Sequence, residues 1–503
     1  MDQKRAGTLL SYLQWIISAL VGVVYTPIML RYLGSGEYGV YSAATAVISF
    51  LTMLDLGFGQ TLVRYDVKYR AEGRTRTAEI CRGTLFVLYL ILGALACVLG
   101  LAAAGEGARL LFGEKFTAGE LDSLGRTLRI LVVNLSLSFP LSVFTSLLTA
   151  QERFVAVKGA NILSTLLTYG GILLALIRGG GSPALALVTT VVSLGVKGAL
   201  ALYALLKLGL RLRFGRPEPG MLGELFRFSF FIFINILIDQ LYANTDKFIL
   251  GALWGTAAIT VYTVGVQFNS LFQQLSTAIS GVYLPHVTKL YAQGADGKAL
   301  SPLFLQVGRV QFLLLAFVLS GFIAFGQQFL LLLSGPENAD AYLIALIIMV
   351  PGIVPLSQNL GISILQAMNK HRFRSLAYLA LAVINVLLSI PLAARWSGIG
   401  AAIGTALACF AGQYAMMNWY YHKKAGLDIP AYWRMAGKIT LRMLPMALPG
   451  YLLNLLPGTG WFSLLVRIAL YTALFLPYGW RFLLQESEKA ALCKIFNRFR
   501  RHP

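Results

Sequence analysis

The segment FSFFIFINILIDQLYANTDKFIL, residues 228–250, is long enough to cross a bilayer once, because about 20 helical residues span the hydrocarbon core. Polar residues nevertheless recur in it at helical spacing. One face carries Asn235, Asp239, Tyr242 and Asp246, and an adjacent stripe carries Gln240, Asn244 and Lys247. Charges at this depth cost about 2.5–3.5 kcal/mol each and rarely face lipid. We therefore expect a helix whose polar side meets a watery cavity or an internal ion pair that joins two helices.

The composition is that of a membrane protein. Of 503 residues, 57% are hydrophobic and only 13% are charged, whereas soluble domains carry nearer 25% charged residues. The net charge of +21 comes mostly from loops on one side, such as RYDVKYRAEGRTRTAEICR and NKHRFR. This positive-inside pattern predicts cytoplasmic N- and C-termini and a multi-pass protein of the cytoplasmic (inner) membrane. The charge is thus a topology signal, and we expect no nucleic-acid partner.

The apolar runs predict an all-α polytopic protein with fourteen membrane spans. They cover residues 8–30, 40–62, 83–104, 128–149, 158–177, 184–206, 228–250, 258–283, 304–325, 341–367, 376–394, 399–421, 438–456 and 461–483. The longest outer loop, residues 105–127, is too short to fold as a domain of its own. Four Cys and four His share no metal-ligand spacing, so no metal site and no cofactor are expected.

The chain contains an internal repeat. A shift of 221 residues superposes Gly34 on Gly255, Tyr41 on Tyr262, Lys68 on Lys289, Ala71 on Ala292 and Gly73 on Gly294. Each copy holds six spans, and an even number of crossings makes the two copies parallel repeats, an architecture found in transporters. We expect an N-lobe at 1–215, a C-lobe at 216–426, and two extra helices with a basic amphipathic tail at 427–503. The tail would anchor on anionic lipid.

A family resemblance lies in the first two spans, TPIMLRYLGSGEYGVYSAATAVISFLTMLDLGFGQTLVRY. The motif residues are Pro27, the turn at 31–34, Glu37-Tyr38-Gly39 with Tyr41, the run 54–57, and Arg64-Tyr65. Asp246-Lys247 followed by Ile249-Leu250-Gly251 is similar to the ending of the seventh span in the same family. The chain resembles the Wzx-type polysaccharide flippases of the MOP (multidrug/oligosaccharidyl-lipid/polysaccharide) exporter superfamily.

The resemblance implies two six-helix lobes arranged in a V, which move a lipid-linked oligosaccharide across the membrane by alternating access. The carrier in many members is undecaprenyl diphosphate, and H⁺ or Na⁺ coupling is the usual proposal. The implied partners are the lipid-linked oligosaccharide, membrane lipids, and a polysaccharide polymerase or export machinery. Lipid II flippases carry several cavity arginines, whereas span eight of this chain offers amides and hydroxyls.

A diphosphate head entering the membrane requires cations. The family places the seventh span at its cavity, so Lys247 is the preferred phosphate contact. Arg31 and Arg64 would mark the two mouths, or serve only as topology charges. Arg309 and Arg467 lie near span ends, where they can snorkel to the interface.

Neutral donors and acceptors suit the sugars. Besides Asn235 and Asn244, the candidates are Gln267, Asn269, Gln273, Gln274, Gln358 and Asn359. Amides can also join helices to one another. Asp55, Asp239 and Asp246 are candidates for ion coupling, since a carboxylate inside a membrane can exchange a proton. Either Asp239 or Asp246 could instead neutralise Lys247.

The predicted function is therefore a flippase for surface polysaccharide assembly, without enzymatic activity. A MATE-type cation or drug antiporter and a lipid II flippase are alternatives that share the fold. A membrane glycosyltransferase or polymerase is the alternative from another class, and it would need a larger extramembrane loop than any here.

Overall fold

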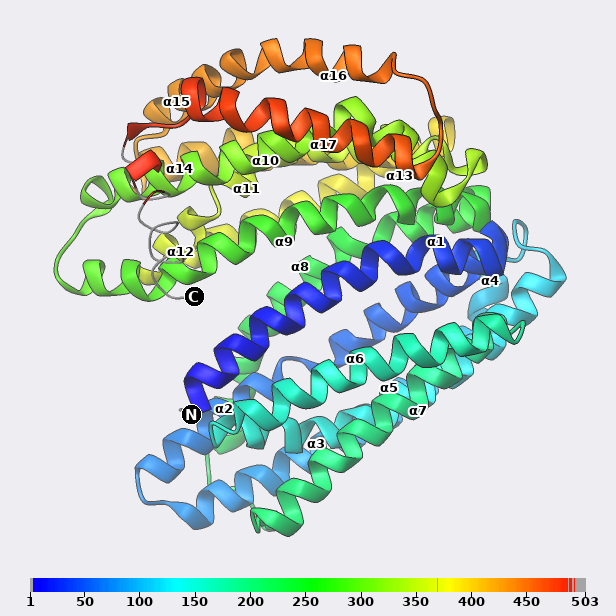
Figure 1. The fold of residues 1–503 in the computed structure, drawn as a ribbon. Helices are drawn as coiled ribbons and strands as arrows, with labels where there is room; N and C mark the ends of the chain where they lie inside the picture. Colours follow the sequence, from blue (N-terminus) through cyan, green and yellow to red (C-terminus); the bar gives the residue numbers. More distant parts are fainter. Residues whose placement is uncertain (1–2, 369, 487, 491–492, 494–503) are drawn as a thin grey trace, which may run out of the picture. The chain divides into compact units, whose positions relative to one another are not determined.

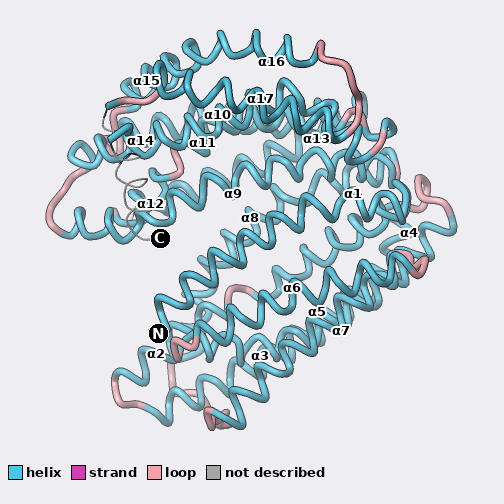
Figure 2. The backbone as a smooth tube through the Cα atoms, viewed as in Figure 1, coloured by secondary structure: helices cyan, strands magenta, loops and turns pink. Residues whose placement is uncertain are grey.

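The structure, a computed structural model, describes residues 3–368, 370–486, 488–490 and 493 (Figure 1). In these residues all regular secondary structure is helical, which confirms the all-α prediction (Figure 2). The predicted amphipathic tail falls largely outside the described residues. The α-helices of the first half are α1 (Gln3–Leu51), α2 (Phe58–Ala71), α3 (Thr75–Ala102), α4 (Ala108–Phe112), α5 (Ala118–Ala150), α6 (Phe154–Ile177), α7 (Ser182–Leu202) and α8 (Met221–Trp254).

The second half continues with α9 (Thr256–Ala292), α10 (Gly297–Ser334), α11 (Ala341–Ser357), α12 (Leu360–Ala367), α13 (His371–Cys409), α14 (Asn418–Lys423), α15 (Ile429–Met443), α16 (Ala447–Asn454) and α17 (Trp461–Tyr478). Short 3₁₀ or π turns extend or join several of them. Ten segments of the described chain are long and apolar enough to cross a membrane. Large apolar side chains point outward, among them Leu110, Leu206 and Phe462, each more than four-fifths exposed. Such a surface requires lipid around it, and the chain is a multi-pass membrane protein.

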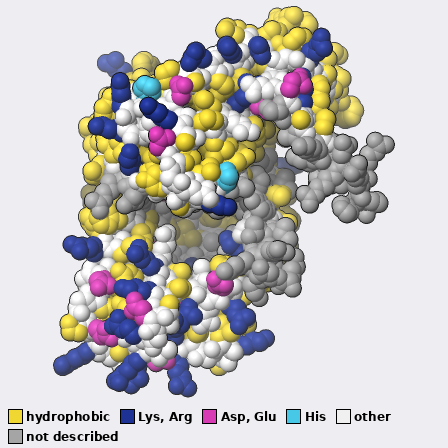
Figure 3. Space-filling model, turned by 90° about the vertical axis from the view of Figure 1, so that its left-hand side faces the viewer, with side chains coloured by type: hydrophobic (Ala, Val, Ile, Leu, Met, Phe, Trp, Pro, Cys, Tyr) yellow, Lys and Arg dark blue, Asp and Glu magenta, His cyan; other side chains and the backbone are white. Residues whose placement is uncertain are grey.

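The chain divides into two compact units. Unit 1 comprises Met1–Thr263 and Ala382–Ala401, and unit 2 comprises Val264–Leu381 and Ala402–Pro503. Figure 3 shows a face on which Lys and Arg side chains gather, with fewer Asp and Glu side chains among them.

Unit 1 is a bundle in which α5 packs against α3 and α7, and α6 packs against α1 and α7 (Figure 1). Its core is formed where α2, α3 and α5 meet, with Phe58, Leu62, Leu85, Tyr89 and Leu147 almost fully buried. Helix α2 also packs against α8. The bundle therefore holds the first half of α8, the helix that carries five of the predicted site residues, Lys247 among them.

Two turns interrupt the first long helical segment where the sequence motifs lie. Gly34 inside α1 has φ 74° and ψ 170°, which ends one helical run and starts another. Leu56 and Gly57 then adopt left-handed conformations between the 3₁₀ turn Thr52–Asp55 and α2. A Cβ on Gly57 would lie 2.5 Å from Ile232 of α8, so both backbone conformation and close packing require glycine there.

Residues paired by the internal repeat have matching conformations. Gly255, the partner of Gly34, has φ 85° and ψ −166° and separates α8 from α9. Helices α2 and α9 end at the paired residues Ala71 and Ala292. Two residues beyond these ends, Gly73 and Gly294 have φ 74° and φ 93°. Three of the five superposed pairs, Gly34/Gly255, Ala71/Ala292 and Gly73/Gly294, therefore lie at breaks or ends of helices.

Unit 2 is organised around α10, which packs against α11, α12, α15, α16 and α17. Phe304, Leu360 and Tyr432 are fully buried in its core, and Tyr471 lies in the same cluster. Helix α11 contains Pro351 and ends at Ser357, where the Ser357 hydroxyl lies 2.5 Å from that of Tyr432. The C-terminal helices α15, α16 and α17 are therefore an integral part of this unit.

Candidate functional site

The polar face predicted on α8 divides into an exposed part and a buried part. Asn235 and Asp239 are exposed, whereas Asn244 and Asp246 are 7% and 3% exposed. The second part is buried because the end of α8 packs tightly against its neighbours in unit 1. A Cβ on Gly251, for example, would lie 2.6 Å from the ring of Phe112. Only the first part of this face is exposed.

Lys247 belongs to a chain of side chains along α8. Its ammonium nitrogen lies 3.2 Å from Oδ1 of Asn244, to which it donates, and the Asn244 amide donates to Oε1 of Gln240 at 2.8 Å. Lys247 itself is half-buried. The predicted stripe of Gln240, Asn244 and Lys247 thus forms a continuous hydrogen-bonded chain. An ammonium has three N–H donors, of which the bond to Asn244 uses one.

Two of the three candidate coupling acids are bound to tyrosine hydroxyls. Asp55, half-buried at the turn between α1 and α2, accepts a hydrogen bond from the buried Tyr89 of α3. Asp246 accepts one from Tyr262, which is also buried. Asp239 is the exposed acid of the three. Their role in ion coupling stays a prediction.

Both candidate mouth arginines are exposed in unit 1. Arg31 precedes the break at Gly34, and Arg64 lies in α2. The Arg64 guanidinium lies over the ring of Phe228 in α8, 4.3 Å from its centroid, a cation–π contact. An apolar pocket of about 480 Å³ is lined by the same part of α8, and its lining residues are Leu56, Phe226, Arg227, Ser229, Phe230, Phe231 and Phe233.

In unit 2 the predicted amides have two kinds of surroundings. Gln273 of α9 is exposed, and Gln267, Asn269 and Gln274 are half-buried. Asn359, between α11 and α12, donates to the Ser276 hydroxyl of α9 at 3.2 Å, so it also joins helices. Gln358 is 2% exposed, and its Nε2 has no hydrogen-bond partner among the described residues. A buried amide of this kind calls for a water or a ligand group.

The strongest buried charge cluster of unit 1 was not singled out by the sequence. Asp66 in α2 is fully buried and accepts hydrogen bonds from Arg82 at 2.6 Å and from Arg70 at 2.8 Å. Arg70 also donates to the Ala150 carbonyl at the end of α5, at 2.8 Å. The i, i+4 spacing of Asp66 and Arg70 was the available signal, but the more buried partner, Arg82, comes from another helix.

Arg309 and Arg467, predicted near span ends where they can snorkel, are both buried by the protein. Arg309 is 9% exposed, and its Nε lies 2.9 Å from the Glu488 carboxylate. Arg467 is 6% exposed and donates to Gln328 at 2.5 Å and to the Gly458 carbonyl at 2.8 Å. Both arginines satisfy polar groups at helix ends inside unit 2. Sequence position near a span end could not distinguish this from snorkelling.

Unit 1 therefore carries the half-buried cation Lys247 with its amide chain, and the exposed acid Asp239. Unit 2 carries the exposed and half-buried amides of α9. Such groups bind anions and hydroxyl-rich solutes through hydrogen bonds. The chemistry of the accessible groups favours binding and transport.

Comparison with solved structures gives the class of the fold. The structure matches a lipid II flippase MurJ in an inward closed conformation with a TM-score of 0.73 at 15% identity, over 93% of this chain and 98% of that one. It matches an inward-facing MATE family multidrug resistance transporter of the MOP superfamily with a TM-score of 0.62 at 14% identity, over 81% and 96%. A MOP superfamily transporter from Pyrococcus furiosus gives 0.57 at 16% identity, over 84% and 98%.

The fold is thus shared with a lipid II flippase and with a MATE family transporter. A search among curated proteins found no match. Residues 5–291, more than half of the chain, match the family described as polysaccharide biosynthesis protein. The chain belongs to this family, and the predicted Wzx-type resemblance is confirmed.

Proposed function

We propose that this protein flips a lipid-linked oligosaccharide, carried on undecaprenyl diphosphate, across the bacterial cytoplasmic membrane for surface polysaccharide assembly. The diphosphate–sugar head enters the membrane beside α8 while the isoprenoid chain stays in lipid, and alternating access then exposes the head on the outer side. A polymerase or export machinery would receive the product. The proposal joins the family's role in polysaccharide biosynthesis with the fold shared with a lipid II flippase.

One observation carries the substrate assignment: Lys247 is half-buried within a membrane helix and is held by an amide chain. A charge at that depth is costly and is retained where it meets an anionic group. In unit 1 the exposed Asn235 of α8 would hydrogen-bond sugar hydroxyls. In unit 2 the exposed or half-buried amides of α9, Gln267, Asn269, Gln273 and Gln274, are suited to the same role. Asp239, exposed on the same helix, is the candidate for H⁺ or Na⁺ coupling, and Asp55 is the next.

We further infer fourteen crossings in two parallel six-helix repeats, with cytoplasmic termini. The breaks at Gly34 in α1 and at Trp396–Ser397 in α13 divide two of the ten apolar segments in two. Helix α9 and the pair α15–α16 supply the remaining two crossings. The matching turns at Gly34 and Gly255 support the repeat. Cysteine accessibility in the basic loops tests the orientation.

The decisive experiment measures flipping of a fluorescent lipid-linked oligosaccharide in proteoliposomes, with a membrane-impermeant quencher outside. Lys247→Met should slow flipping about tenfold or more, because a hydrogen bond to a charged group is worth about 1.5–3 kcal/mol. Lys247→Arg keeps the charge and should retain most of the rate. Lys438→Met, at an exposed lysine of α15, is the control and should flip at the wild-type rate.

Full flipping by well-folded Lys247→Met would remove the phosphate assignment. Asp239→Asn should abolish any dependence of flipping on an H⁺ or Na⁺ gradient; an unchanged dependence would transfer the coupling role to Asp55.

A cation exporter of the MATE type is the second candidate. It is favoured by the exposed carboxylate of Asp239 on α8 and by the fold. Uptake of a fluorescent organic cation into the same proteoliposomes, lost in Asp239→Asn, together with an absence of oligosaccharide flipping, would support this candidate against the flippase.

A further inference from the structure

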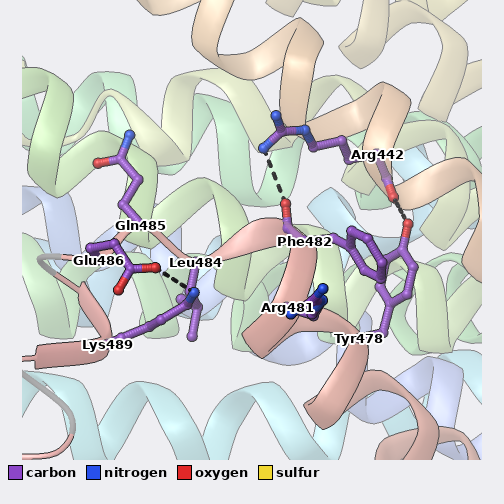
Figure 4. A pocket seen from close by; sticks show the side chains of 8 residues that line it. All are labelled: Arg442, Tyr478, Arg481, Phe482, Leu484, Gln485, Glu486 and Lys489. Atoms are coloured by element: carbon purple, nitrogen blue, oxygen red, sulfur yellow. Dashed lines mark hydrogen bonds and ion pairs between the residues drawn. The ribbon is translucent and has the colours of Figure 1, made fainter.

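Unit 2 contains a cavity of about 440 Å³ where the last membrane helix ends (Figure 4). The residues that line it are Arg442, Tyr478, Arg481, Phe482, Leu484, Gln485, Glu486 and Lys489. None of them belongs to the proposed transport site, so a ligand of this cavity is independent of the transported substrate.

The cavity is built by the junction of α15 with the end of α17. After Tyr478 the chain forms a π turn, Gly479–Leu483, and becomes extended at Leu484. Such an end leaves backbone carbonyls without helical partners. The Arg442 guanidinium donates to the Phe482 carbonyl at 3.1 Å, and the Tyr478 hydroxyl donates to the Arg442 carbonyl at 2.5 Å. These two bonds, drawn in Figure 4, fix one wall of the cavity.

The cavity has an excess of positive charge. Three cations line it, Arg442, Arg481 and Lys489, against the single acid Glu486. The Lys489 ammonium pairs with Glu486 at 2.7 Å, and the Glu486 side chain is 88% exposed. The neighbouring Glu488 is paired with Arg309, with both side chains 11% exposed. The two guanidinium groups therefore stand without a lining acid of their own, and a guanidinium fits two oxygens of a phosphate.

Exposed apolar side chains adjoin the cations. Phe482 lines the cavity and is 53% exposed, and Trp480 beside it is 43% exposed. Leu441 and Leu444, on either side of Arg442 in sequence, are 68% and 61% exposed. Tryptophan next to basic residues at the end of a membrane helix is the pattern of the membrane–water interface. Cations and apolar surface together match a headgroup phosphate with its acyl chains.

We propose that this cavity binds the phosphate of an anionic phospholipid headgroup at the membrane surface. Arg481 and Arg442 hold the phosphate oxygens, Lys489 adds a third positive charge, and the acyl chains lie along Phe482 and the exposed Leu441 and Leu444. Free phosphate has the same oxyanion chemistry but would use only the cations. A zwitterionic headgroup is neutral overall, because it carries a cationic group beside its phosphate, and the cations of the cavity would repel that group.

The test uses the purified full-length protein in detergent, with phosphatidylglycerol, phosphatidylcholine or inorganic phosphate added. Native mass spectrometry measures bound lipid, and a thermal-shift assay measures stabilisation. Arg481→Gln is the main variant, because the Arg481 side chain makes no hydrogen bond within the described residues. It should weaken phosphatidylglycerol binding about tenfold, as for a lost charge-assisted hydrogen bond. Adding Lys489→Gln should weaken it further.

Arg434→Gln is the matched control, at an exposed arginine of α15 outside the cavity, and should bind phosphatidylglycerol within about twofold of wild type. Equal phosphatidylglycerol binding by wild type, Arg481→Gln and the double variant would overturn the proposal. Equal binding of phosphatidylcholine and phosphatidylglycerol would do the same. Stabilisation by inorganic phosphate that needs Arg481, without any stabilisation by phosphatidylglycerol, would assign the site to free phosphate and overturn the lipid assignment.

Discussion

Asp66→Asn should destabilise unit 1 strongly, because Asp66 is the buried acid that two arginines share. It is fully buried, and its two oxygens accept from Arg82 at 2.6 Å and from Arg70 at 2.8 Å. Removing one partner of a buried pair costs about 3–5 kcal/mol. The lower end applies, since the Arg70 side chain is 34% exposed and an asparagine oxygen still accepts one bond. At about 2–4 °C per kcal/mol, the expected fall in melting temperature is about 6–12 °C.

Alkylation of Cys81 gives a local assay for this change. Its thiol is buried in the core of unit 1, next to Arg82 in sequence, so it reacts only when this region opens. Heated samples are alkylated, and the peptide that contains Cys81 is quantified by mass spectrometry. Asp122→Asn is the control, because the Asp122–Arg126 pair has side chains about 60% exposed and should contribute less than about 1 kcal/mol. If Asp66→Asn and Asp122→Asn melt at the same temperature, the buried-pair reasoning is refuted.

Two further substitutions test packing around α8. Gly57→Ala should lower the free energy of unfolding by about 2 kcal/mol or more, because φ is 77° and the new Cβ would lie 2.5 Å from Ile232. Adding Ile232→Ala should recover part of that stability. An unchanged melting temperature in Gly57→Ala would contradict the predicted strain. Tyr262→Phe removes the hydroxyl bound to the buried Asp246 and should lower the free energy of unfolding by about 1–3 kcal/mol, measured by thermal unfolding. A variant as stable as wild type would show that the Asp246 carboxylate is satisfied without this hydroxyl.

The sequence by itself determined the class of the fold. Apolar runs of spanning length predicted the membrane helices, because a backbone in lipid must satisfy its own hydrogen bonds. Residues 228–250 lie inside α8, and the predicted gap between residues 30 and 40 contains the break at Gly34. These features depend on local composition and backbone preference, which the chain carries residue by residue. The break at residues 52–57 lies inside the predicted span 40–62 and was not predicted.

Side-chain partners were decided by the tertiary structure. Helical spacing grouped Asn235, Asp239 and Asp246 on one face, but only packing at the end of α8 exposed the first two and buried the third. The surroundings of Arg309 were likewise decided by tertiary packing, because its acid partner Glu488 is far along the chain. A charge near a span end looks the same in sequence whether it meets water or a buried carboxylate. Which of these it meets depends on helices that are distant in sequence, because the burial of a charge is a property of everything packed around it.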